Sequence, residues 1–204
     1  MSRFQTFTVR NGEIWTRFSA TPVFFRASHE HAAAAEKLIS STHTDMELID
    51  KLDNIYQERA SAIVFACSCL EAFINGLIQE HFPSLWKGVE QLPVTAKWQL
   101  FLWLKGKRNV FVPSRQPYQT LLEVVRSRNS LVHFKSEYHK AALHGNGKMV
   151  THTENHLMPR DLVRDLPDRL RELIKELCQA TGITVPVDNP TATSWLAGTG
   201  ELAV

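Results

Sequence analysis

The stretch "VVRSRNSLVHF" places Arg128, Asn129 and His133 in an otherwise apolar run. An arginine offers charged hydrogen-bond donors, an asparagine both donates and accepts, and a histidine can take up or release a proton. At about 100° per residue, Asn129 faces the apolar stripe of a helix that begins near Tyr118, and Arg128 and His133 flank this stripe on opposite sides. Arg126 lies beside His133. One helix thus presents a guanidinium, a carboxamide and an imidazole around its apolar stripe.

The residues alone leave two interpretations of these three polar side chains open. Arginine and asparagine are costly to bury without partners, so their presence needs a reason. In the structural interpretation, Arg128 forms an ion pair between helices, while Asn129 and His133 cap the end of the helix, where the dipole favours histidine. In the functional interpretation, the same three groups form a site for chemistry.

Positive charge gathers around this stretch. The whole chain has a net charge of +2. Residues 105–140 contain eight basic residues against Glu123 and Glu137, which gives +6 locally and leaves −4 for the rest of the chain. The basic residues are Lys105, Lys107, Arg108, Arg115, Arg126, Arg128, Lys135 and Lys140.

The chain opens with a predicted hairpin and a short helix. In "FTVRNGEIWTRF", apolar and polar residues alternate on both sides of Asn11-Gly12, a strong signal for two strands joined by a two-residue turn. Because two strands alone are marginally stable in water, we expect this hairpin to lie against helices. Ser28, followed by "HEHAAAAEKLIS", is expected to cap an Ala-rich helix.

One long helix dominates the pattern. Thr44 and Glu47 form a predicted capping box, and apolar residues recur at helical spacing from there to Ile78. About 35 helical residues would span roughly 50 Å, so a bend near Asp53 would not be surprising, although we predict helix throughout.

Further helices are predicted downstream. One runs from about Val94 to Leu104 and stops at Gly106, and another starts after Pro117 and reaches about Phe134. The following segment is mostly loop, with a possible hairpin at "GNG".

The last predicted helix spans about Arg160 to Ala180 and ends at Gly182. Pro167 either kinks it or, with Asp165 as its cap, starts its main part. The pattern predicts a mainly α-helical bundle, divided into a hairpin appendage (1–27), a helical domain (28–182) and a tail (183–204).

The motif "RNSLVH" resembles the arginine, polar residue and histidine motif of the HEPN family, the helical domains of prokaryotic toxins, phage-defence systems and CRISPR nucleases. The resemblance covers roughly residues 45–135, through the successive segments "ASAIVFACSCLEAFINGLI", "AKWQLFLWL" and "YQTLLEVVRSRNSLVHFK". It implies an all-α, up-down HEPN-like bundle, here with a small N-terminal β-hairpin.

The resemblance also implies a function. HEPN domains of this type are metal-independent endoribonucleases that act as homodimers, with two motifs meeting in one cleft. His133 would then exchange a proton with RNA, Arg128 would stabilise charge on the phosphate, and Asn129 would position phosphate or imidazole. Pairing across a two-fold axis would bring both kinds of group together. Arg126, Lys135, Arg108 and Lys107 are expected to bind the RNA backbone.

One departure concerns regulation. HEPN toxins controlled by a partner nucleotidyltransferase often carry a tyrosine two residues after the histidine, where this chain has Lys135, with Tyr138 nearby. An antitoxin or nucleotidyltransferase partner is therefore only one possibility. Glu71 is expected either to pair with Arg128 across the bundle or to make a structural hydrogen bond. The alternative function is a non-catalytic helical module for dimerisation or partner binding.

The sequence gives weaker support for metal binding or for base stacking by tryptophan. We expect no metal and no cofactor, because His144, His152 and His156 lack a carboxylate or cysteine partner at suitable spacing. Trp98 and Trp103 lie in an apolar helix and are expected in the core rather than stacked on bases. Ser130 is expected at the surface.

The N-terminus lacks the features of a signal peptide, and the most apolar segment is interrupted by Glu71 and Asn75, so we expect a cytoplasmic protein without a membrane span.

Overall fold

The computed structural model describes residues 5–10, 12–112, 114–133, 142–143, 149–150 and 157–183, and most of these residues are helical. The helices are α1 (Thr21–Ser40), α2 (Asp45–His81), η1 (Pro83–Leu85), α3 (Trp86–Val89), α4 (Val94–Leu104), α5 (Tyr118–Val132) and α7 (Arg160–Thr181). The strands are β1 (Gln5–Arg10), β2 (Glu13–Phe18), β3 (Ala142–Leu143) and β4 (Met149–Val150). The predicted mainly helical fold class is confirmed.

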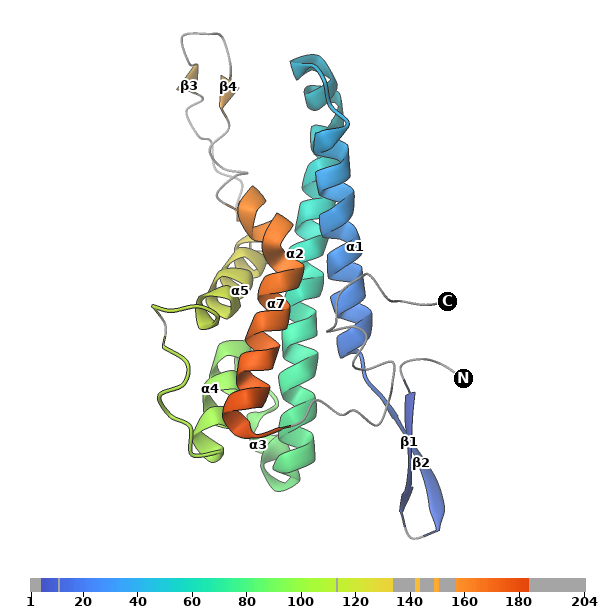
Figure 1. The fold of residues 1–204 in the computed structure, drawn as a ribbon, viewed down its shortest axis with the longest axis vertical. Coiled ribbons are helices and arrows are strands. Elements are labelled where there is room, and N and C mark those ends of the chain that lie inside the picture. Colours follow the sequence, from blue (N-terminus) through green and yellow to red (C-terminus); the bar gives the residue numbers. More distant parts are fainter. Residues whose placement is uncertain are drawn as a thin grey trace.

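The long helix α2 lies at the centre of the bundle, between α1 on one side and α7 on the other (Figure 1). It also contacts α4 and α5. Its start is the predicted capping box, in which the Thr44 hydroxyl accepts from the Glu47 amide at 3.2 Å while the Glu47 carboxylate accepts from the Thr44 amide at 3.2 Å. The helix is continuous through Asp53. Its inward residues are buried, and Leu70 and Ile74 among them are fully so.

The same helix is long and apolar enough to cross a membrane by length and composition. Residues Met46–His81 meet that test, yet 56% of the most apolar window is buried inside the bundle. The core helix of a soluble protein passes the same test of length and composition.

Helix α1 differs from the prediction. It begins at Thr21 rather than after Ser28, with Pro22 in its first turn, where the missing amide of proline costs nothing. Ser28 is buried within the helix, and its hydroxyl donates to the carbonyl of Ala62 on α2 at 2.9 Å. Ser28 is small enough for close contact between the two helices, and its hydroxyl has a partner on α2. It lies inside α1 and is therefore not a cap. The expected boundary between residues 27 and 28 falls inside a helix.

Helices α4 and α7 end close to the predicted positions. Gly106 adopts a positive φ of 72° just after α4, and Gly182 closes α7 with a φ of 66°. Helix α7 runs from Arg160 through a buried Pro167, so Asp165 does not act as its cap.

Two short antiparallel strand pairs complete the described structure. Val9 lies opposite Ile14 in the first pair, and Ala142 lies opposite Val150 in the second. The expected turn residues at 145–147 lie outside the described residues.

The two tryptophans of α4 have opposite environments. Trp98 is fully buried and its indole N–H donates to the Leu70 carbonyl at 3.3 Å. Trp103 is 57% exposed. The prediction of a core position was therefore right for Trp98 and wrong for Trp103, because the apolar character of α4 extends to its outward face.

Candidate functional site

Helix α5 turns a different face to the core than its apolar stripe predicts. Its buried residues are Tyr118, Thr120, Leu121, Val124 and Ser127. At about 100° per residue, this face is rotated by roughly 100° from the predicted stripe. The small side chains of Thr120 and Ser127 allow close approach to the bundle, and the Thr120 hydroxyl donates to Gln116 Oε1 at 2.8 Å. Asn129, which the stripe would have turned inward, is exposed.

The rotation leaves part of the apolar stripe in an open groove of about 580 Å³. Thr95 of α4 contributes to its wall, and α5 supplies Leu122, Val125, Arg126, Asn129, Ser130 and His133. Arg126, Asn129 and His133 are exposed to solvent. The predicted placement of Arg126 beside His133 on one shoulder of α5 is confirmed. The groove combines a cation, an amide, an imidazole and two hydroxyls around an aliphatic floor.

His133 occupies the end of α5. It is the C-terminal capping residue, and its backbone amide donates to the Asn129 carbonyl at 2.9 Å. The cap fixes the backbone of His133 with respect to the helix. The exposed imidazole, which lines the groove, can reach a bound ligand. Capping and a functional role are therefore compatible at this residue.

Arg128 lies on the other side of Asn129 and does not line the groove. It is half-buried, and its Nη1 donates to Asn129 Oδ1 at 2.9 Å. Arg128 also lies close enough to Cys67 of α2 to act on its thiol. Burial raises the pKa of Cys67 to about 11, and the positive charge of Arg128 opposes that rise. Within one chain, Arg128 thus holds Asn129 and reaches the groove only through it.

Glu71 pairs with a lysine rather than with Arg128. Its Oε1 accepts from Lys97 Nζ at 3.3 Å, and this lysine is almost fully buried while 41% of the Glu71 side chain is exposed. The Lys97 ammonium also lies 5.8 Å from the centre of the Trp86 ring. Among the described residues, the ion-pair partner of Glu71 is therefore on α4, which disfavours the expected contact with Arg128.

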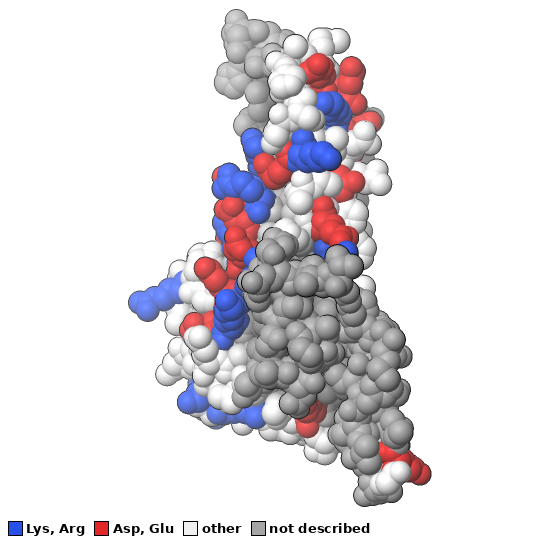
Figure 2. Space-filling view, turned by 45° about the vertical axis from the view of Figure 1, so that its right-hand side comes forward, with Lys and Arg blue, Asp and Glu red and all other residues white. Residues whose placement is uncertain are grey.

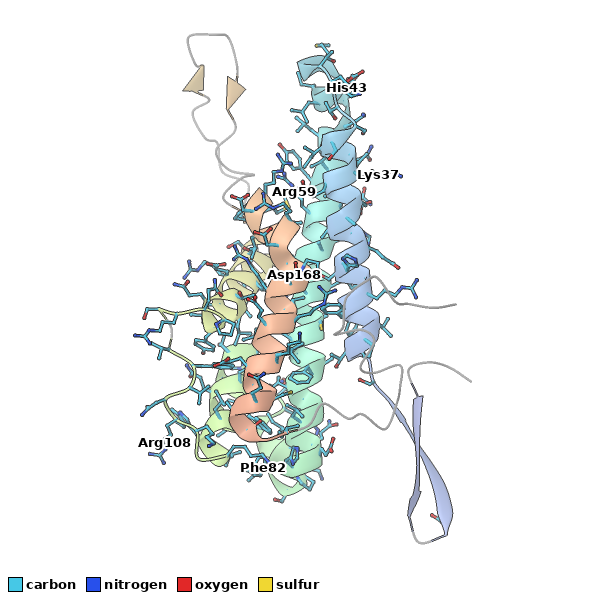
Figure 3. The ribbon with its side chains drawn as sticks, in the orientation of Figure 1. Lys37, His43, Arg59, Phe82, Arg108 and Asp168 are labelled. Atoms are coloured by element: carbon cyan, nitrogen blue, oxygen red, sulfur yellow. The ribbon has the colours of Figure 1, made fainter. Side chains whose placement is uncertain are left out.

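The predicted RNA-binding cations have separate positions. Lys107 and Arg108 are exposed in the segment between α4 and α5, and Arg108 lies at the lower end of that segment (Figure 3). Arg126 alone among these cations lines the groove. Lys135 and Tyr138 lie outside the described residues.

Metal-ligating residues do not gather in the described part of the chain. It contains no cluster of three or more His, Cys, Asp or Glu side chains that could hold an ion. His144, His152 and His156 lie outside it. The three cysteines are free and buried, and burial raises the pKa of Cys178 to about 11, as it does for Cys67. These thiols are poor nucleophiles and poor metal ligands.

Two polar groove residues, in addition to the aliphatic Leu122 and Val125, were not predicted as part of the site. Thr95 comes from a different helix, and no spacing in the sequence connects it to α5. Ser130 was expected at the surface, but it is half-buried in the groove wall. Its position four residues after Arg126 places both on one helix face, a signal that was available from the sequence.

The chain matches no protein-family model, no curated protein and no solved structure.

Proposed function

We propose that this chain is a HEPN-type endoribonuclease that cleaves RNA without a metal ion and acts as a homodimer in toxicity or phage defence. The observation that carries the proposal is the groove itself. It exposes the imidazole of His133 beside Asn129 and Arg126, and Arg128 fixes the Asn129 carboxamide. The bundle would then be the up-down HEPN arrangement with its N-terminal hairpin.

The residues suit cleavage of RNA by its own 2′-hydroxyl. The 2′-oxygen attacks the adjacent phosphorus, the bond to the 5′-oxygen breaks, and a cyclic phosphate and a free 5′-hydroxyl result. His133 takes the proton of the 2′-hydroxyl, and a solvent water gives one to the leaving oxygen. Arg128 and Arg126 stabilise the charge that develops on the phosphate oxygens.

Dimerisation would bring Arg128 and His133 to the same phosphate. Arg128 and His133 project from different sides of α5, so a single copy cannot direct both at the same phosphate. A two-fold axis that runs past the ends of two α5 helices would bring the guanidinium of one copy to the imidazole of the other. Val132 lies between Arg128 and His133, and its side chain is 56% exposed. Such an interface would cover it.

The direct test is RNA cleavage by purified protein in EDTA. Wild type should cleave, and His133→Ala should lose at least about 100-fold in rate, the usual contribution of a general acid or base. His43→Ala is the matched control, because His43 is an exposed histidine at the far tip of α1 and α2 (Figure 3). Cleavage that persists in His133→Ala would exclude the assigned chemistry.

The second candidate is a non-catalytic dimerisation or partner-binding module. Two observations support it, because each gives a proposed catalytic residue a structural role. Arg128 donates a hydrogen bond to Asn129 within the same chain, and His133 caps the C-terminal end of α5. In that case wild type and Arg128→Ala would be equally inert on many RNAs but would differ in oligomeric state, as measured by light scattering.

A further inference from the structure

The C-terminal end of α4 and the segment that follows it expose large apolar side chains. Trp103 is 57% exposed, and Leu104 and Val112 are exposed by 38% and 39%. Tryptophan is highly buried on average, so Trp103 together with Leu104 and Val112 is a candidate contact surface.

The sequence on both sides of Trp103 carries charge of one sign. Residues 91–122 contain five Lys and Arg residues and no Asp or Glu. Lys107, Arg108 and Arg115 are exposed, and in the described part of the chain none of them has an ion-pair partner. These three cations are available to an anionic ligand.

The other two lysines of the segment point elsewhere. Lys105 turns toward the bundle, with its ammonium 5.6 Å from the Phe82 ring centre and 5.8 Å from that of Phe101. Lys97 is buried against Glu71. Glu80 lies near Lys105, because the charges of both residues act on His81. Its negative charge therefore adjoins the inward-turned lysine.

The exposed face of α4 connects this patch to the groove. Thr95, Gln99 and Trp103 follow one another at intervals of four residues, and Thr95 lines the groove. Eight residues of helix place Trp103 about 12 Å from Thr95 along the axis. An extended strand of a few nucleotides can span this distance.

We propose that Trp103 is a base-stacking site, with Lys107, Arg108 and Arg115 contacting the phosphates of an unpaired strand whose next nucleotides enter the groove. That the strand is RNA rests on the proposed function. Stacking on tryptophan needs an unpaired base, and the cations supply the sequence-independent attraction to the backbone. Continuity with the groove favours nucleic acid over a lipid surface, which would also attract a tryptophan among cations.

The test is binding of a fluorescein-labelled 12-nucleotide RNA, followed by anisotropy, in the His133→Ala background so that the strand stays intact. Trp103→Ala should weaken binding by about tenfold or more, and Trp103→Phe should retain most of it. The Lys107→Ala, Arg108→Ala double variant should also lower the salt dependence, by a slope of about 1.4 in log–log units. Met46→Ala, an exposed apolar residue at the opposite tip, is the matched control and should bind like its parent.

The outcomes separate the two proposals. Unchanged binding in Trp103→Ala overturns the stacking site, even if the wild type cleaves RNA. Trp103-dependent binding in a protein whose wild type never cleaves removes the nuclease proposal and leaves the stacking site standing. Trp103-dependent sedimentation with vesicles containing phosphatidylserine, without RNA binding, would overturn the site in favour of a membrane surface.

Discussion

Two faces of this bundle carry many cations but use them differently. On the face of α1 and α7, the arginines are paired: Arg160 donates to both oxygens of Glu36, at 3.2 and 2.9 Å, and Arg164 lies 2.7 Å from Asp165. Positive and negative side chains alternate over that part of the surface in Figure 2. On the face of α4 and α5, Lys107, Arg108 and Arg126 have no acidic partner within the described residues.

Paired and unpaired cations are expected to contribute to different properties, the former to stability and the latter to ligand binding. A paired surface cation adds a little to the free energy of unfolding and has satisfied its donors within the chain. An unpaired cation among others of the same sign adds nothing, because like charges repel, but it remains available to a phosphate. We therefore expect changes on the α1 and α7 face to alter stability, and changes on the outward α4 and α5 face to alter ligand binding.

The largest effect on stability should come from the two tryptophans of α4. Trp98→Ala should lower the free energy of unfolding by about 3–5 kcal/mol, because a fully buried ring is lost from the core. Trp103→Ala should change it by no more than about 0.5 kcal/mol, since its ring is mostly in solvent. Urea unfolding measures both, and a large loss in Trp103→Ala would show that this face is structural.

The Lys97 and Glu71 pair should respond asymmetrically. Glu71→Ala leaves a buried ammonium without its partner and should cost about 1–3 kcal/mol of unfolding free energy. Lys97→Met should cost less than about 1 kcal/mol, because the remaining carboxylate is partly exposed and can be hydrated. Equal losses in the two variants would indicate that the ion pair itself, rather than burial of the lysine, governs stability here.

The Glu36 and Arg160 pair should make the α1 and α7 face sensitive to acid. The hydrogen bond from Arg160 is the main cause that holds the pKa of Glu36 below its usual value of 4.5. Its stabilisation is therefore fully present above the unfolded-state value and is lost as pH falls through the lower folded-state pKa. Glu36→Gln should cost at most about 1 kcal/mol at pH 7 and should reduce the loss of thermal stability between pH 5 and pH 3.

The smallest change is expected on the unpaired face. The Lys107→Ala, Arg108→Ala double variant should keep the free energy of unfolding within about 0.5 kcal/mol of wild type, measured at low and at high salt. A clear loss of stability at low salt would mean that these cations have partners within the fold and would contradict the comparison of the two faces.

Much of the fold was predictable from local signals. The capping box at Thr44, the glycines at the ends of α4 and α7, and the long periodicity of α2 each specify a helix from neighbouring residues alone. The start of α1 was misplaced because Ser28 has the chemistry of a cap but satisfies its hydroxyl on Ala62 of another helix. Sequence cannot distinguish these two partners.

The site was predictable only in part. Spacing alone placed Arg126 and His133 on one side of α5, and both line the groove. The buried face of α5 was misjudged because Thr120 and Ser127 are polar yet small enough to pack closely, while Leu122 and Val125 remain at the groove. Thr95 and the partner of Glu71 depend on how α4 packs against its neighbours, which is a tertiary property.

The central claim is that two copies of the chain share one site, and mixing two inactive variants tests it most directly. Arg128→Ala and His133→Ala proteins are each expected to be inert on RNA. Once they exchange subunits, one site in the mixed dimer keeps Arg128 from one copy and His133 from the other, so cleavage should return. A mixture as inert as its components, beside a wild type that cleaves RNA, would contradict the shared site.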